Sequence, residues 1–354
     1  MAIKKAFANS FSLVKSEVAD FYRSQKLYPV IITLIIAAIM PFFVSSYVIS
    51  EVLTPMIIFA IYASSWNLLA SSGQGSLGHA AFLGIGGFTS ALLTIKLGLP
   101  SIASLFLGSL ISAAIGVLIG LACVRLKAWF LAMVTFGFSV IIVTIFSEFD
   151  EFTGAIMGFR TPLIVERGIP FYYTALVFSA ISIFIIYLIM KSKLGLAFRA
   201  IHQNELEAKM IGINTAKYRL IAFVISTFFA GLAGGLYAQS IQYIQNFIFA
   251  PYYSFLPLMM SVIGGLGTIE GPIVGSVIIR VIDSYLPSLD SALDGLLHPL
   301  FPSVSHVGPP LRMLGLGVFF IVIVIFAPKG VSPLIKKAYN YLRSSPKEKK
   351  HDER

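Results

Sequence analysis

Residues 66–93 read WNLLASSGQGSLGHAAFLGIGGFTSALL, and in this stretch Gly73, Gly75 and Gly78 spell G-x-G-x-x-G. In a dinucleotide-binding enzyme this pattern follows a strand and opens a helix, and an acidic residue about 20 positions later holds the ribose. Here a long apolar run precedes the glycines, and Lys96 stands near the place of the acid. The match is therefore accidental, and the glycines instead interrupt two hydrophobic runs.

The composition predicts a polytopic membrane protein, because 57% of the 354 residues are hydrophobic and only 12% are charged. A bilayer core about 30 Å thick is crossed by a helix of roughly 20 apolar residues. Such runs predict an all-α fold with about ten transmembrane or half-membrane helices and broken segments. They lie at 30–49, 52–70, 78–97, 102–124, 128–146, 171–190, 220–240, 247–267, 272–286 and 311–327.

Basic residues predict the orientation, because Lys and Arg are retained on the cytoplasmic side. Four segments hold 21 of the 26 Lys and Arg, namely 1–27, 125–127, 191–219 and 329–354. Ten crossings place all four on one side, so both termini are expected in the cytoplasm. The loops of the other side carry acids such as Glu51 and Asp283. The same asymmetry and contact with anionic lipid explain the net charge of +10, and no nucleic-acid partner is needed.

The chain divides into three predicted parts. Residues 1–27 place apolar side chains on one helical face and predict an amphipathic cytoplasmic helix on the membrane surface, with a loosely ordered tail as the alternative. Residues 28–328 form the transmembrane domain, and residues 329–354 form a basic cytoplasmic tail.

Two glycine-rich breaks predict a transport pathway. Non-helical backbone at membrane depth persists only where protein covers it or where it lines a water-filled cavity, and paired breaks are typical of transporters. The second break lies in VIGGLGTIEGPIVGS, residues 262–276. The alternatives are close helix packing for the glycines and helix capping for Ser76. The candidate pathway residues are Asn67, Gly73, Gln74, Gly75, Ser76, Gly78, His79, Gly264, Gly265, Gly267, Gly271 and Pro272.

Catalysis has no candidate residues in this sequence. Cys123 is the single cysteine, and His79 has no carboxylate or second histidine near it in the sequence, so we predict no metal site and no catalytic residue. The sequence also lacks the G-x-x-x-x-G-K-[ST] phosphate loop. We therefore expect this chain to bind no cofactor and any ATP to be hydrolysed in another subunit.

The cytoplasmic segment 191–219 is rich in helix formers and predicts a short surface helix that ends at Gly212. Its charged residues include Arg199, Glu205 and Glu207. Its apolar residues Leu206, Met210 and Ile211 offer a contact for a partner's groove. A solvated linker helix is the alternative.

Four stretches resemble the permeases of branched-chain amino acid ABC importers, specifically the longer of the two permease types in this branched-chain amino acid, urea and amide uptake family. They are residues 66–93, 195–238, 262–276 and 315–331. The resemblance implies a multi-pass permease in a bacterial or archaeal plasma membrane, with the ABC importer permease fold. Its partners would be a second related permease, two cytoplasmic ATPases that use ATP and Mg, and an extracytoplasmic binding protein. The solute would be leucine, isoleucine or valine.

The resemblance also assigns ATPase coupling to the segment 191–219, through Arg199, Glu205, Leu206, Glu207, Ala208 and Gly212. Leu206 and Lys209 depart from the family's usual acidic and alanine positions, and His202 stands where an arginine is common. The alternatives are a permease of the same type for urea or short amides, or an ion-coupled secondary transporter. A secondary transporter needs an acid or histidine within the membrane, for which His79, Glu270 and Asp283 are the candidates.

Overall fold

The computed structural model describes residues 35–124, 126, 128–149, 154, 157–297, 308–328 and 330–333. The chain forms two compact units, residues 1–49 and 50–354, which we describe separately. In the first unit, residues 35–49 contain the short helices η1 (Met40–Phe42) and α3 (Ser46–Val48). The predicted amphipathic helix at 1–27 lies outside the described residues, and the basic tail is described only at 330–333.

In the residues of the second unit that the structure describes, the regular elements are helices and one short strand pair. The strands β1 (Phe159–Arg160) and β2 (Tyr243–Ile244) pair antiparallel, with Phe159 opposite Ile244. The helices, of which η2 begins at the end of the first unit, are η2 (Ile49–Leu53), α4 (Thr54–Ala70), α5 (His79–Leu97), α6 (Ser101–Cys123), α7 (Ala128–Glu148), α9 (Ile169–Lys191), α10 (Lys193–Gln203), α11 (Glu205–Met210), α12 (Thr215–Ile241), η3 (Asn246–Phe249), α13 (Pro251–Gly264), α14 (Glu270–Leu297) and α15 (Gly308–Phe326).

Six helices of the described chain are long and apolar enough to cross a membrane, which confirms the prediction of an all-α polytopic membrane protein. They are Ser46–Ala70, His79–Leu97, Ser101–Cys123, Trp129–Glu148, Ile169–Lys191 and Thr215–Ile241. A shorter apolar helix covers Leu314–Phe326. These seven coincide with predicted spans to within a few residues at most ends, because length and hydropathy alone decide them.

The remaining predicted boundaries were wrong where charged residues lie inside helices. Glu51, expected in a loop, lies in the π-helical turn η2, and the helical run into α4 already starts at Ser46. Asp283, counted among the loop acids although it stands near the end of the predicted span 272–286, lies within α14, which has 28 residues and extends well past that span. The predicted span 247–267 is divided into η3 and α13, with Pro251 opening the second helix. Paired charges inside a helix have the same local sequence signature as a loop.

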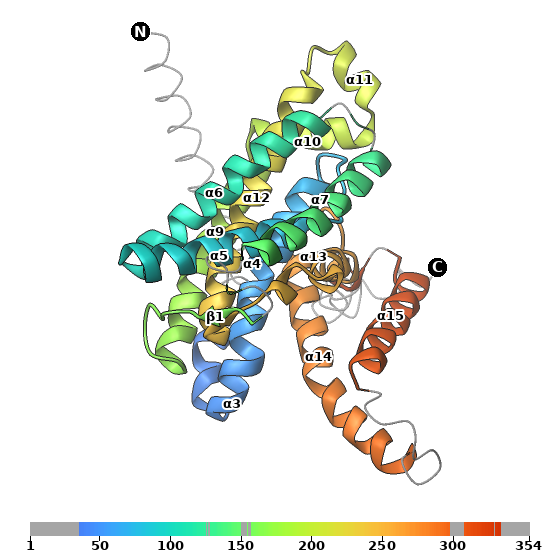
Figure 1. The fold of residues 1–354 in the computed structure, drawn as a ribbon. Coiled ribbons are helices and arrows are strands. Elements are labelled where there is room, and N and C mark those ends of the chain that lie inside the picture. The colour runs from blue at the N-terminus through green and yellow to red at the C-terminus, as the bar shows by residue number, and fades with distance from the viewer. Residues whose placement is uncertain are drawn as a thin grey trace, which may run out of the picture. The chain divides into compact units, whose positions relative to one another are not determined.

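The core is built around α12, which packs against α4, α5 and α6. Glycines allow the helix backbones to approach closely, because a Cβ at Gly86 would lie 2.3 Å from Gly231 Cα, and one at Gly234 would lie 1.8 Å from Leu83 O. These contacts support the interpretation that glycines in α5 and α12 allow the two helices to pack closely. In Figure 1, α11 lies at the top of the view beyond the end of α12, and α14 and α15 lie at the lower right.

Candidate functional site

The first break, residues 71–78, joins α4 to α5 through a buried turn. Gly73 has a φ of 74°, which glycine adopts without strain. The indole Nε1 of Trp66 donates to the Ser76 carbonyl at 2.8 Å. The Ser76 hydroxyl accepts from the Gly78 amide at 3.3 Å, just before α5 begins. Ser76 therefore makes a local turn bond before the helix and does not cap α5, whose N-cap is Gly78 with no side-chain cap bond.

The glycines of this break differ in their surroundings. A Cβ at Gly78 would lie 1.8 Å from Thr135 O of α7, so this glycine is needed for packing. A Cβ at Gly75 would have no atom within 4 Å. Gln74 is buried, and its Oε1 accepts from the Ser72 hydroxyl at 3.2 Å. Packing therefore explains Gly78 but does not explain Gly75.

His79 is fully buried at the start of α5. Its Nε2 lies 3.2 Å from Ser65 Oγ and 3.3 Å from Ser226 Oγ. Both hydroxyls already donate elsewhere, Ser65 to the Tyr62 carbonyl and Ser226 to the Ser65 carbonyl, each at 2.7 Å. The imidazole is therefore assigned as the donor to both oxygens. In this conformation His79 links α5 to α4 and α12 inside the core.

The second break separates α13 from α14 and is a tight glycine turn. Gly265 and Gly267 have φ values of 125° and 73°, which L side chains rarely adopt. A Cβ at Gly264 would lie 1.7 Å from Gly271 O, so the two sides of the turn touch. The Gly271 amide donates to Thr268 Oγ1 at 3.0 Å. The glycines here are required by backbone geometry.

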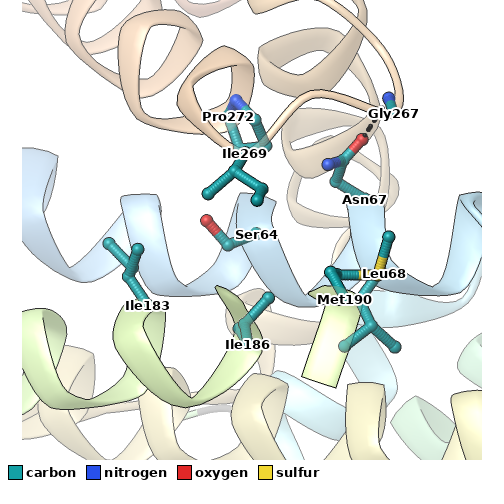
Figure 2. Close-up of a pocket in the computed structure, with 9 residues that line it drawn as sticks. All are labelled: Ser64, Asn67, Leu68, Ile183, Ile186, Met190, Gly267, Ile269 and Pro272. Atoms are coloured by element: carbon teal, nitrogen blue, oxygen red, sulfur yellow. Dashed lines mark hydrogen bonds between the residues drawn. The ribbon is translucent and has the colours of Figure 1, made fainter. Parts of the chain in front are cut away.

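Asn67 connects the two breaks. From the last turn of α4, its Nδ2 donates to the Thr268 carbonyl at 2.7 Å, and its Oδ1 accepts from the Gly267 amide at 2.9 Å. Its own carbonyl accepts from the Ser71 amide at 2.9 Å. Figure 2 shows the Asn67 side chain turned toward Gly267 across the pocket rim. The last turn of α4, from which the first break starts, is therefore bonded to the second break, about 200 residues later in the sequence.

A small pocket lies beside Asn67, between α4, α9 and the second break (Figure 2). It has room for about one water molecule. The Ser64 hydroxyl is buried here with no hydrogen-bond partner among the described residues. The lining residues are Ser64, Asn67, Leu68, Ile183, Ile186, Met190, Gly267, Ile269 and Pro272. In this conformation the pocket is too small for an amino acid.

The segment 191–219 folds as two short helices, α10 and α11. Arg199 Nη1 donates to the Met190 carbonyl at 2.9 Å and ties α10 to the end of α9. Asn204 Oδ1 caps α11 by accepting from the Leu206 and Glu207 amides at 3.0 and 3.4 Å. The predicted helix stop at Gly212 is confirmed by its φ of 84° and by its amide bond to the Lys209 carbonyl at 3.0 Å.

Charges hold α11 against the start of α12. Glu205 contacts Lys209 Nζ at 2.7 Å and Arg219 Nη2 at 2.9 Å. The hydrogen bond from Lys209, together with the charges of Arg219 and Lys209, lowers the pKa of the Glu205 carboxyl against the opposing effect of burial. Ala208 is buried beneath the helix.

The opposite side of α11 is an exposed apolar surface, formed by Leu206, Met210 and Ile211. Their exposed fractions are 72%, 86% and 74%. We call these three residues the α11 apolar surface. Apolar side chains grouped on one exposed face of a helix are typical of a partner contact.

The α10–α11 segment also reaches the first break. A Cβ at Gly73 would lie 3.4 Å from His202 Cα in α10. Gly73 therefore lies close to α10, while Asn67, four residues before the first break, bonds to the second break. Sequence reasoning missed Thr268, Trp66 and Arg219 in this chain, although a basic residue in the first turn of an apolar span was a visible signal for Arg219.

Comparison with known proteins agrees with this architecture. Residues 48–327 match the family model described as branched-chain amino acid transport system / permease component. The chain is 28% identical to the high-affinity branched-chain amino acid transport system permease protein LivM of Salmonella typhimurium, over 88% of this chain and 76% of that protein. The LivM protein of Escherichia coli is 27% identical over the same shares.

A shorter match is to the high-affinity branched-chain amino acid transport system permease protein LivH of Salmonella typhimurium. It is 30% identical over 37% of this chain and 41% of that protein. No solved structure matches the chain significantly. The family match covers most of the chain and includes both breaks and the α10–α11 segment. This chain therefore belongs to the family of multi-pass plasma-membrane permease components of branched-chain amino acid transport systems.

Proposed function

We propose that the chain is the permease subunit of an ATP-driven importer that translocates leucine, isoleucine and valine. The family match and the relatives named as LivM support this solute class. The protein conducts the solute and makes no covalent bond. ATP and Mg are bound by partner subunits.

Its partners are a second permease, two cytoplasmic ATPases and an extracytoplasmic binding protein. The partial similarity to LivH supports a second permease of related sequence, since the two permease types share part of their length with this chain. The basic segments 1–27, 125–127, 191–219 and 329–354 support cytoplasmic termini and a cytoplasmic position for α10 and α11. In this assignment the transmembrane domain is 28–328, preceded by the amphipathic segment.

The α11 apolar surface is the observation that carries this proposal. The helix α11 has six residues, with Ala208 on its buried side and Leu206 and Met210 on its exposed side. A short helix with such an exposed apolar side is suited to a groove on another protein. Glu205 and Arg219 fix it to α12 through a salt bridge at 2.9 Å, so a push on α11 moves the start of a membrane helix. Arg199, Glu207 and Gly212 maintain the shape of the segment.

The breaks then act as the moving part of the pathway. When the ATPases close, α10 and α11 shift, and the contact of His202 with Gly73 passes the shift to the first break. Asn67 passes it to the second break at Gly267. Paired non-helical segments rearrange with a smaller loss of hydrogen bonds than intact helices, which suits a cavity that opens alternately to the two sides. The solute then contacts residues in or beside the breaks, such as Gln74 and Gly75.

Uptake of labelled leucine tests the proposal in cells that lack this chain and in cells that regain it. Restored uptake that stops on ATP depletion but survives collapse of the proton gradient supports an ATP-driven importer. Uptake that follows the proton gradient alone contradicts it and favours a secondary transporter. Restored uptake of urea or acetamide without leucine contradicts the solute assignment.

The coupling role is tested by the double variant Leu206→Asp, Met210→Asp. Carboxylates on the α11 apolar surface remove its apolar contact without touching the core, so we expect normal membrane insertion and uptake reduced at least about tenfold. The matched control is Leu97→Asp, because Leu97 is 67% exposed at the end of α5, away from α11. Equal uptake by the double variant and the control contradicts the coupling assignment.

A further inference from the structure

A buried ion pair in α14 belongs to neither break nor to the coupling segment. Arg280 Nη1 donates to Asp283 Oδ2 at 2.6 Å, and the two side chains are only 12% and 1% exposed. Burying charges among apolar helices is costly, and such pairs contribute little net stability compared with apolar side chains. A buried pair of ionisable residues in a transport protein is therefore a candidate for binding a ligand.

Aromatic and polar groups from three helices surround this pair. The Arg280 guanidinium lies 5.4 Å from the centroid of the Phe59 ring of α4 and donates to the Glu51 carbonyl at 3.2 Å. The Tyr252 hydroxyl of α13 donates to Asp283 Oδ1 at 3.1 Å. Arg280 Nε is buried with no hydrogen-bond partner among the described residues. The cluster therefore contains an unused cationic donor beside a carboxylate.

The cluster lies at the end of α4 opposite the breaks. Phe59 is in the first turns of α4, whereas Asn67 is in its last turn. On the exposed side, Glu51 forms a salt bridge with Arg167, and both side chains are about half exposed. The cluster therefore lies at one end of α4, and the second break contacts the other end.

We propose that Arg280, Asp283 and Phe59 bind the zwitterionic end of an α-amino acid. Arg280 receives the carboxylate, and Asp283 together with the Phe59 ring receives the ammonium group. With no solute present the two side chains neutralise each other, and a zwitterion replaces each partner with a group of the same charge. The site thus exchanges one neutral pair for another without leaving a buried charge unpaired.

The proposal rests on the proposed function and narrows it. Urea and short amides carry no net charges to replace those of Arg280 and Asp283, so such a site favours amino acids over them. An ion pair whose role is only to fix α14 to α4 does not respond to the charges of the solute. Response to solute charge is therefore the property that separates the two interpretations.

The test measures equilibrium binding to the purified complex of the permeases and ATPases without the binding protein. The probes are leucine, leucinamide, which lacks the carboxylate, and 4-methylpentanoate, which lacks the ammonium group. We expect saturable binding of leucine and binding at least about tenfold weaker for each analogue, since each loses one charge-assisted contact. Arg280→Gln and Asp283→Asn should each weaken leucine binding at least about tenfold as well.

The double variant Arg280→Gln, Asp283→Asn separates loss of binding from loss of folding. It removes both charges of the pair, so it should assemble normally and still fail to bind leucine. Arg167→Gln is the matched control, because it removes an exposed arginine from the adjacent salt bridge and should retain leucine binding. Its side chain is 40% exposed.

The site is refuted if the assembled double variant binds leucine like the unmodified complex, if the unmodified complex binds both analogues as well as leucine, or if it binds none of the three. Uptake of labelled leucine by the complete transporter is measured in parallel. Absence of that uptake rejects the proposed function, whereas normal uptake by a complex with unaltered binding in the variants rejects only the site.

Discussion

Replacing Asn67 by alanine removes the side chain that joins the two breaks. The change leaves the Gly267 amide and the Thr268 carbonyl without the partners that now lie 2.9 and 2.7 Å away. A buried polar group that loses its partner costs about 1–3 kcal/mol. In membrane proteins the average contact is worth only about 0.6 kcal/mol, because the unfolded chain in the bilayer finds other partners.

Because both bonds are only part-buried, for Asn67→Ala we expect a loss of about 1 kcal/mol in the free energy of unfolding, at the lower end of that range. Two bonds are lost rather than one, and the turn at Gly265 and Gly267 has positive φ values that keep its backbone from joining a helix. Uptake should fall more than stability, since the link between the breaks is cut. Asn67→Asp keeps the acceptor for Gly267 but places a carboxylate against the Thr268 carbonyl, so it should be at least as damaging.

The matched control is Ser64→Ala, one turn earlier on α4 in the same pocket (Figure 2). The Ser64 hydroxyl has no hydrogen-bond partner among the described residues, so its removal should leave stability unchanged or slightly increased. Unfolding of purified protein in lipid nanodiscs gives the stability, and leucine uptake in cells gives the activity. Equal stability and equal uptake for Asn67→Ala and Ser64→Ala refute the link between the breaks.

Two further predictions concern packing and pH. Gly78→Ala places a Cβ 1.8 Å from Thr135 O and should strongly reduce the amount of folded protein in the membrane. Gly75→Ala has no atom within 4 Å of its Cβ and should be made at the normal level. Immunoblots of membrane fractions compare the two variants, and equal amounts contradict the packing argument. Glu205 has a pKa below its ordinary value of 4.5, so its contacts stabilise the segment fully above pH 4.5, and this contribution is lost as the pH falls through the lowered pKa. Hydrogen exchange of the α11 amides, corrected for the intrinsic rate, should show protection that decreases in that range and a weaker pH dependence in Glu205→Gln. An unchanged pH dependence in that variant argues against the Glu205 contacts as the source.

Local patterns predicted most of the membrane helices and the helical character of the segment 191–219. The spans of α5, α6 and α9 follow from runs of apolar residues long enough to cross a bilayer. The stop at Gly212 and the exposure of Leu206 and Met210 follow from helix-end chemistry and helical periodicity, both of which act over a few residues. The family resemblance carried the functional prediction, and the family match confirmed it.

The same patterns failed where a polar residue has a distant partner. The sequence could not show whether His79 lies in a pathway or in the core, because Ser226, one of its two contacts, is 147 residues away. It counted Asp283, near the end of the predicted span 272–286, among the loop acids because a carboxylate inside a buried helix needs partners, and Tyr252 of α13 is recognised as one only after the helices have packed.

The sequence by itself determined a polytopic helical fold with two glycine-rich breaks and a helical segment at 191–219, because length, hydropathy and backbone flexibility are local properties, and the assignment as a permease came from the family resemblance. The tertiary structure alone decided that Asn67 joins the breaks, that Gly73 touches α10 and that Arg280 and Asp283 form a buried pair under the Phe59 ring. Those contacts depend on how α4, α13 and α14 pack against one another. Packing brings together residues that are about 200 positions apart, and no local pattern records which partner a polar side chain will meet.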